Sequence, residues 1–245
     1  MKKNTLTLTA AGLQCIAMVC MLLDHLWATV VPGNEGMTCL GRLAFPIYAF
    51  SLVEGYTHTH HLSKYVLRLL LFALVSEIPF NLMCSGSMWY PIHQNVLWTF
   101  LLGLALVHWN ARAVKLPLWR RILRGGCSAL LGFLVGTLTM VDYYGFGVLM
   151  ILVFWFFRGR KWWCLLGQLL LLWVINTELM GGLVYEFQAL GRLWVVHQQS
   201  FALLALIPIW LYRGSQGYNR PWFRYFRYCF YPGHMLLLAL LRGLL

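Results

Sequence analysis

Acidic residues are scarce in this chain, and so are charged residues of either sign. The 245 residues include only 7 Asp and Glu, and charged side chains make up 11% of the sequence, whereas 60% of the residues are hydrophobic. A soluble domain carries roughly a quarter charged residues, so the composition excludes an ordinary water-soluble protein. Lipid is the solvent that this composition fits.

The motifs of soluble enzymes are also missing. The sequence has no GxSxG elbow, no P-loop, no GxGxxG after a strand and no HExxH. Its 7 cysteines are scattered without a CxxC pair, and we interpret them as small apolar packing residues. A disulfide between Cys39 and Cys84 stays open, because both fall near the predicted outer surface. We expect no metal site, since Glu54 and His58 alone make a poor ligand set.

Apolar segments of a length that can span a membrane run through the whole chain, which predicts an all-α, polytopic membrane helix bundle. No repeat or soluble linker interrupts it, so residues 1–245 are predicted to form one membrane domain. The first segment follows Met1-Lys2-Lys3 without a cleavage site, and we expect a retained anchor. About nine spans are predicted, at 12–31, 39–57, 65–84, 94–110, 121–139, 143–158, 162–179, 199–213 and 223–241. Gly181, Gly182 and Glu186 interrupt 180–197, which predicts a lateral or re-entrant piece.

Basic residues alternate between connections, and this alternation predicts the orientation. Short loops rich in Lys and Arg stay in the cytoplasm, so the N-terminus is predicted to be cytoplasmic and the C-terminus, after nine spans, to be outside. The formal net charge of +12 is therefore explained by topology, and nucleic-acid binding is not expected. The basic connections contain Lys2 and Lys3, then Lys64 and Arg68, then Arg112, Lys115, Arg120, Arg121 and Arg124, then Arg158, Arg160 and Lys161, then Arg213, Arg220, Arg224 and Arg227, with Arg192 as the main exception.

Ionisable and amide side chains gather in the predicted outer half of the membrane. Such groups are costly in hydrocarbon unless they are paired or hydrated, so they are candidates for a functional site. A shared depth allows them to meet in one polar pocket, although structural ion pairs are the alternative. The group comprises Asp24, His25, Arg42, Glu77, Gln94, Asn95, Asp142 and Tyr143. We expect Arg42 to pair with Asp24, Glu77 or Asp142, and a carboxylate beside His25 to fix its tautomer.

A second polar group lies toward the cytoplasm. His58, Lys64 and Arg68 follow the second predicted helix and form a basic rim that suits an anionic head group or a nucleotide-bearing cofactor, unless they only signal topology. His234 follows Pro232 within the last predicted helix. A functional role and a packing role are equally open for it.

These residues resemble motifs of the TraX family of bacterial membrane proteins. The resemblance runs in order along most of the chain and is strongest in the first hundred residues. It rests on Met21 to His25, Gly41 to Phe50, Val53 to Thr59, Tyr65 to Arg68, Ser76 to Phe80, Gln94 to Thr99, Asp142 to Gly145 and Phe230 to His234.

The resemblance implies a multi-pass protein of the bacterial cytoplasmic membrane that transfers acyl groups. TraX proteins are named for conjugal transfer, and the best-known member is implicated in N-terminal acetylation of pilin. Multi-spanning acyltransferases of similar plan depend on a first-helix histidine, which points to His25 as general base or transient acyl carrier, with Asp24, Arg42 and Glu77 around it. Acetyl-CoA is the implied donor, held by His58, Lys64 and Arg68. Gln94, Asn95, Asp142 and Tyr143 are then expected to meet an extracytoplasmic acceptor.

Two other classes of function stay open at the sequence level. In a proton- or ion-coupled transporter or flippase, Asp24, Glu77 and Arg42 would form a relay. The hydropathy shows no clear inverted repeat that would favour it. A non-catalytic assembly factor for a pilus or surface polymer would leave the polar group without a role.

Overall fold

Helices dominate the computed structural model, which describes residues 7–189 and 191–244. Lys2 and Lys3 lie outside the described residues. In chain order the helices are α1 (Ala10–Thr29), α2 (Glu35–Gly41), α3 (Ala44–His58), α4 (Leu62–Ser85), α5 (Val96–Ala111), α6 (Leu118–Leu138), α7 (Tyr144–Phe156) and α8 (Trp162–Trp173), followed by the π-helix η1 (Val174–Leu179), the 3-10 helix η2 (Gln198–Ala205), α9 (Leu206–Leu211) and α10 (Pro221–Leu244).

Five helical segments are long and apolar enough to cross a membrane. They are Ala10–Thr29, Glu35–His58, Leu62–Ser85, Leu118–Leu138 and Trp162–Leu179, and each contains most of a span that the sequence predicts. The chain is therefore a multi-pass membrane protein by the length and composition of its helices.

The remaining predicted spans also correspond to helices, but these are shorter or less apolar. Val96–Ala111, Tyr144–Phe156 and Gln198–Leu211 are too short to meet the same standard. At 1.5 Å per residue, the 13 residues of α7 cover only about 20 Å of a hydrocarbon core that is roughly 30 Å thick. α10 is 24 residues long but carries arginines among its aromatic residues. The count of nine spans stays a prediction.

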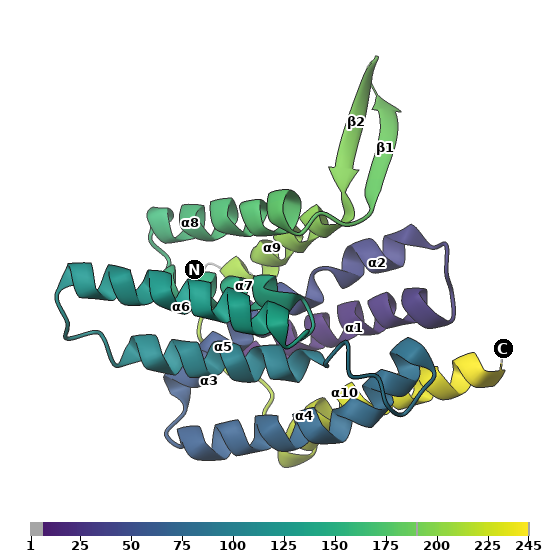
Figure 1. Ribbon diagram of the computed structural model, residues 1–245, viewed down its shortest axis with the longest axis horizontal. Coiled ribbons are helices and arrows are strands. Elements are labelled where there is room, and N and C mark those ends of the chain that lie inside the picture. The colour runs from purple at the N-terminus through teal and green to yellow at the C-terminus, as the bar shows by residue number, and fades with distance from the viewer. Residues whose placement is uncertain (1–6, 190, 245) are drawn as a thin grey trace, which may run out of the picture.

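Small residues position the helices around α7, which lies inside the bundle (Figure 1). A Cβ atom on Gly145 would lie 2.3 Å from the carbonyl oxygen of Phe133, so glycine is required for the close approach of α6 to α7. α6 buries Gly132 against α7 and turns Leu130, which is 62% exposed, outward. Small residues facing inward and leucines facing outward are typical of a helix in contact with lipid.

The loops lie at two ends of the bundle. The α3–α4, α5–α6 and α7–α8 loops are at one end, and the α1–α2 and α4–α5 loops are at the other (Figure 1). The loop after α9 joins the first end, because Arg160 donates to the carbonyl oxygens of Trp210 and Tyr212, each at 2.6 Å. We call this end, with the basic connections 59–64, 112–124, 157–161 and 212–227, the basic end. Which side of the membrane it faces stays a prediction.

The segment 180–197 contains a β-hairpin, a structure that the sequence interpretation did not consider. Its expected lateral or re-entrant placement in the membrane stays a prediction. Strands β1 (Val184–Ala189) and β2 (Arg192–His197) pair antiparallel, with Phe187 opposite Trp194. The hairpin projects from the bundle at the end opposite the basic end (Figure 1). β-Branched residues such as Val195 and aromatic residues such as Phe187 favour a strand over a helix here.

Candidate functional site

An ion pair between Asp24 on α1 and Arg42 forms the first part of the site. Of the three carboxylates that the sequence offered as partners for Arg42, Asp24 is the one that binds it. Arg42 sits where α2 ends and α3 begins. Pro46 explains this break, because a proline has no N–H to donate to the carbonyl of the residue four positions earlier, which is Arg42. The break presents the guanidinium to α1.

Gly41 allows the backbones of α1 and α2 to approach at the ion pair. A Cβ atom on Gly41 would lie 2.4 Å from the Cβ atom and 2.5 Å from Oδ1 of Asp24. No side chain larger than hydrogen fits there without moving Asp24. The glycine is therefore part of what positions the carboxylate.

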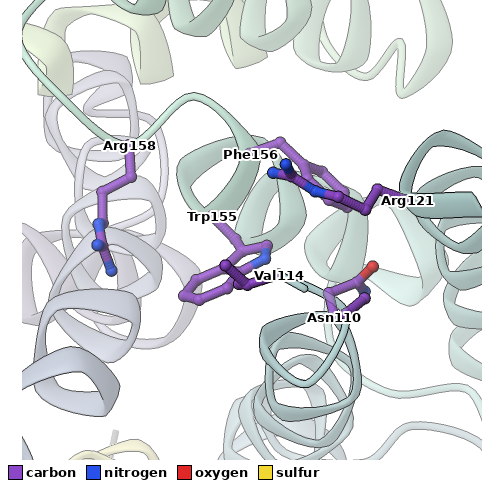
Figure 2. A pocket seen from close by; sticks show the side chains of 7 residues that line it. Asn110, Val114, Arg121, Trp155, Phe156 and Arg158 are labelled. Atoms are coloured by element: carbon purple, nitrogen blue, oxygen red, sulfur yellow. The ribbon is translucent and has the colours of Figure 1, made fainter. Parts of the chain in front are cut away.

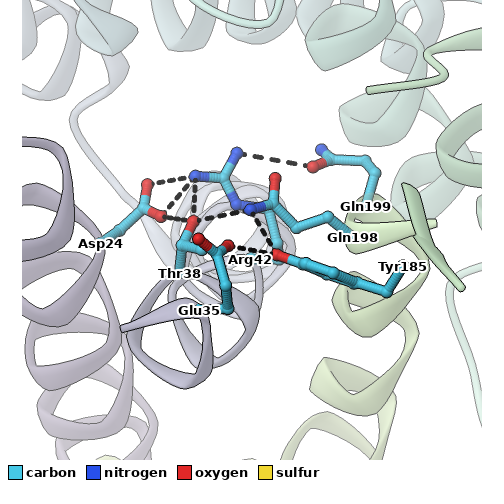
Figure 3. A network of polar contacts seen from close by, with 7 residues as sticks. All are labelled: Asp24, Glu35, Thr38, Arg42, Tyr185, Gln198 and Gln199. Carbon is cyan, nitrogen blue, oxygen red and sulfur yellow. Dashed lines mark hydrogen bonds and ion pairs between the residues drawn. The ribbon is translucent and has the colours of Figure 1, made fainter. Parts of the chain in front are cut away.

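Amide and hydroxyl groups complete the surroundings of the ion pair (Figure 3). Thr38 donates from Oγ1 to Asp24 Oδ1 at 2.7 Å, and it accepts from Gln198 Nε2 at 3.2 Å. Arg42 Nη1 donates to Gln199 Oε1 at 3.5 Å. The Asp24 and Arg42 side chains are 19% and 18% exposed, so most of their charge is removed from bulk water.

The network continues to the β-hairpin through Tyr185. Its hydroxyl accepts from Gln198 Nε2 at 3.2 Å and donates to Glu35 Oε2 at 2.6 Å. Burial raises the pKa of the Tyr185 hydroxyl, and the hydrogen bond to Glu35 raises it further, so this group stays protonated as a donor. A cavity of about 360 Å³ borders the network between α2 and the hairpin, lined by Glu35, Gly36, Cys39, Tyr185, Phe187, Val196 and Phe201.

His25 turns away from Asp24 and meets His234 on α10. The distance between His25 Nδ1 and His234 Nε2 is 2.7 Å, and the two ring planes differ by 6°. His234 Nδ1 lies 2.7 Å from the carbonyl oxygen of Phe230. A carbonyl can only accept, so His234 donates from Nδ1 and, when neutral, has a lone pair on Nε2. His25 must then donate from Nδ1, which leaves His25 Nε2 as an unprotonated nitrogen.

Asp142 and Tyr143 close the site from the loop before α7. Asp142 and Arg42 both interact electrostatically with the His25 ring, and Arg42 interacts with Tyr143. Tyr143 has φ 60° and its ring stacks on Phe45 at 4.2 Å between centroids. Left-handed backbone is uncommon for a bulky residue, and it occurs at Met140, Tyr143 and Tyr144 here. Such strain persists where the surroundings impose it, often at functional sites.

Glu77 forms a separate cluster with Asn95 and Trp98. Its Oε2 accepts from Asn95 Nδ2 and, at 3.1 Å, from Trp98 Nε1. Asn95 also caps α5, since its Oδ1 accepts from the backbone N–H of Leu97 at 3.1 Å. Two donors stabilise the carboxylate and tie α4 to α5. Glu77 therefore has a structural partner set that the sequence interpretation, which grouped it with His25 and Arg42, did not include.

Gln94 and His93 link the α4–α5 loop to Asp142. Gln94 exchanges backbone hydrogen bonds of 2.9 Å with Met140 and Asp142, and its side chain donates to the carbonyl of Pro91. His93 Nε2 lies 3.3 Å from Asp142 Oδ1. This hydrogen bond raises the pKa of His93 above its usual value. The contact holds the two loops together beside the site.

The predicted donor residues His58, Lys64 and Arg68 lie at the basic end, away from His25. His58 approaches Glu54 at 3.9 Å and its side chain is 67% exposed. Lys64 and Arg68 are exposed, and the Arg68 guanidinium lies 6.0 Å from the Tyr228 ring centroid. Within the part of the chain that the structure describes, no group of three His, Cys, Asp or Glu side chains could hold a metal ion, and Cys39 and Cys84 are free thiols.

The sequence interpretation missed several members of the site. His234 was singled out, but nothing in the sequence joins it to His25. Thr38 and Tyr185 are common residue types with no distinguishing pattern. The adjacent Gln198 and Gln199 were a usable signal, because Gln198 precedes and Gln199 opens the otherwise apolar span predicted at 199–213, and both are buried in the structure.

Comparisons with known proteins find similarity along almost the whole chain. A family model described as "TraX protein" matches residues 9–242. The chain is similar to "Probable fimbrial assembly protein FimC, serogroup H1" of Dichelobacter nodosus, at 27% identity over 256 residues that cover 94% of this chain and 94% of that protein. No solved structure matches the chain.

Proposed function

This chain belongs to the TraX family, and we propose on that basis that it is a membrane-embedded acyltransferase. It moves an acetyl group from acetyl-CoA to an amine or hydroxyl acceptor on the extracytoplasmic side. The observation that carries the proposal is the hydrogen bond between His25 and His234, which leaves an unprotonated nitrogen on an imidazole ring that interacts electrostatically with Asp142 and Arg42. An oriented neutral imidazole is the commonest general base in acyl transfer.

The lone pair on His25 Nε2 performs the proton transfer. It takes a proton from the acceptor nitrogen or oxygen as that atom attacks the thioester carbon. A C–N or C–O bond forms and the C–S bond breaks. The proton then passes to the departing thiolate, so the products are the acetylated acceptor and free CoA. The same lone pair could instead accept the acetyl group for a short time before the acceptor attacks.

Arg42 and Tyr143 supply positive charge and a hydroxyl donor near the reacting carbonyl. The oxygen of a thioester gains negative charge when a nucleophile adds to its carbon, and fixed donors stabilise it most in a site shielded from water. Asp24, Thr38 and Gln199 hold the Arg42 guanidinium in place. Their role in the proposal is to position Arg42.

The acceptor enters from the end that carries the hairpin, where the cavity lined by Glu35 and Tyr185 borders the network around Arg42. Gln94, Asp142 and Tyr143 lie at that same end. The similarity to a fimbrial assembly protein favours a pilin N-terminal amine as acceptor, with a surface glycan hydroxyl as the other class. The donor reaches the site from the basic end, which the loop charges predict to be cytoplasmic.

The test is release of CoA by the purified protein in detergent, with radiolabelled acetyl-CoA and candidate acceptors. His25→Ala should abolish release and labelling of the acceptor, whereas His60→Ala, at an exposed loop position of the basic end, should keep the wild-type rate. Full activity in His25→Ala would refute the proposal. Acetyl found on His25 after a denaturing quench would identify it as the acyl carrier.

Two rival functions predict other outcomes of the same measurement. The name of the fimbrial relative favours a non-catalytic assembly factor, which would bind a pilus component and release no CoA. Ionisable groups within membrane helices often form proton or ion pathways. A proton- or ion-coupled transporter would therefore show coupled flux of its substrate, and no covalent product would form.

A further inference from the structure

A second cavity lies at the basic end, far from His25. Its volume is about 230 Å³, and it is formed by the end of α5, the loop that follows, the start of α6 and the end of α7 (Figure 2). It is lined by Asn110, Ala113, Val114, Arg121, Trp155, Phe156 and Arg158. None of the residues proposed above for acyl transfer is among them.

Positive charge in this cavity is not neutralised by the protein. Arg121 and Arg158 lie on opposite sides of Trp155 (Figure 2), and neither forms an ion pair with a carboxylate among the described residues. Glu54, at the end of α3 on this side of the bundle, instead approaches His58. Two unpaired guanidinium groups facing one hollow favour a ligand with phosphate oxygens.

Aromatic and amide groups in the cavity suit the rest of a nucleotide. Trp155 forms one wall, and the Arg158 guanidinium lies 5.5 Å from its ring centroid. The Asn110 amide nitrogen donates hydrogen bonds to Leu106 O at 2.8 Å and to Ser128 Oγ at 2.9 Å. Its oxygen has no partner among the described residues and is turned toward Arg121 in Figure 2. That oxygen can accept from an amino or hydroxyl group, and the indole can stack on a base.

We propose that this cavity binds the phosphorylated nucleoside of the acyl donor through Arg121 and Arg158, with Trp155 against the base. The inference rests on the proposed function for its donor. Arg121 and Arg158 then take the phosphate-binding role that the sequence assigned to His58, Lys64 and Arg68. Those three residues lie on α3 and α4, outside the cavity lining.

The length of α7 fits this assignment. Tyr143 precedes α7 at the His25 site and Phe156 ends it at the cavity, so the two sites are separated by 13 residues, or roughly 20 Å of helix. A nucleotide bound here can deliver a thioester to His25 only through a long flexible arm. CoA has such an arm between its diphosphate and its sulfur.

Phospholipid head groups carry the same phosphate chemistry, so the test separates the two sources. Equilibrium dialysis with the full chain in detergent measures binding of adenosine 3′,5′-bisphosphate, which has the nucleotide part of CoA and no thioester. We expect roughly tenfold weaker binding in Arg121→Gln and in Arg158→Gln, from the loss of one charged hydrogen-bonding partner each. Arg213→Gln, an exposed arginine of the same end outside the cavity, should bind as the wild type does. In parallel, the same proteins are tested on vesicles with anionic and with zwitterionic phospholipids.

The inference is overturned if the wild type does not bind the bisphosphate, or if Arg213→Gln weakens binding as much as the cavity variants do. Loss of vesicle binding in the cavity variants without nucleotide binding by the wild type would assign the cavity to lipid and also overturn it. Arg121→Lys and Arg158→Lys keep the positive charge and should keep part of the affinity. Their binding would show that the Gln variants lose affinity through lost charge and not through misfolding. The binding assay needs no turnover, so it is independent of the proposed function. Full CoA release by His25→Ala would refute the proposed function, whereas nucleotide binding by the wild type would still support this site.

Discussion

The tautomer of His25 depends on a residue 209 positions further along the chain. His234→Ala removes the acceptor for the His25 Nδ1 proton, so the imidazole loses its fixed orientation and tautomer. We expect CoA release to fall by roughly 10- to 100-fold, from the loss of one buried hydrogen bond that orients the base. Measuring the rate of CoA release by the purified variant and the wild type checks this fall.

His234→Gln is the matched variant, because its amide oxygen can accept the same proton. Partial recovery of the rate in His234→Gln, at unchanged protein stability, would show that His234 positions His25. Equal loss in both variants would contradict this role and leave His234 as a packing residue.

The ion pair of Asp24 and Arg42 predicts a non-additive effect on stability. Asp24→Asn leaves a largely buried guanidinium without its counter-charge, which should lower the free energy of unfolding by about 3 kcal/mol. Asp24→Asn combined with Arg42→Gln should be less destabilising than Asp24→Asn alone, because no unpaired charge stays behind. Thermal unfolding in detergent measures the stability of the single and the double variant. A double variant that loses as much as the sum of the single variants would contradict the coupling.

Gly41 predicts a steric effect at the same place. Gly41→Ala pushes a methyl group into Asp24 and should lower stability by roughly 1 to 3 kcal/mol, the usual cost of overpacking. Gly36→Ala, on the same short helix, is the control, because its new Cβ atom would meet nothing closer than 3.5 Å. Equal unfolding temperatures for the two variants would argue against the close approach of α1 and α2.

Sequence rules predicted single residues of the site better than their partners. Asp24, His25 and Arg42 stand out because charges within apolar segments are rare and costly. Their grouping was only partly predictable. Asp24 and His25 are adjacent, yet a helix turns neighbouring side chains about 100° apart, so one meets α2 and the other meets α10. Helix packing decides which carboxylate Arg42 binds, and single-sequence periodicity does not contain that information.

At the scale of elements, the contact of His93 with Asp142 links two loops and predicts a pH effect. The pKa of His93 is raised in the folded protein, because its hydrogen bond to Asp142 favours the protonated ring. The stabilisation is therefore complete below the usual value of 6.5 and is lost as the pH rises above 6.5 through the raised pKa.

Unfolding temperatures of the wild type and His93→Gln, measured in detergent from pH 5 to 9, test this effect. The difference between the two proteins should be largest at the acid end and shrink toward the alkaline end. A difference that grows as the pH rises would have the opposite sign and contradict the assignment.

Some elements were predictable and others depended on contacts. Apolar length located all the long helices, since lipid contact requires it along the whole element. The break between α2 and α3 needed attention to Pro46, and the hairpin was missed because 180–197 was compared only with helical patterns. In the first strand of the hairpin, Glu186 and Gln188 alternate with Tyr185 and Phe187, and this period of two is typical of a strand.

At the scale of the whole molecule, the loop charges predict that the basic end faces the cytoplasm and that the end with the hairpin faces the outside. In a cysteine-free background, Lys115→Cys lies in the α5–α6 loop of the basic end and Gln188→Cys lies on the hairpin. A membrane-impermeant maleimide added to intact cells should label Gln188→Cys at once and Lys115→Cys only after permeabilisation. The reverse pattern would invert the predicted orientation.

The most direct test of the account is transfer across the membrane by the purified protein in sealed vesicles. Acetyl-CoA is supplied on the side of the basic end, an acceptor amine is enclosed on the side of the hairpin, and acetylated acceptor is measured inside. Acetylated acceptor should appear inside with the wild type and should be absent with His25→Ala. Uptake or release of the acceptor that depends on a proton gradient, with acetyl-CoA left intact, would contradict acyl transfer and favour transport.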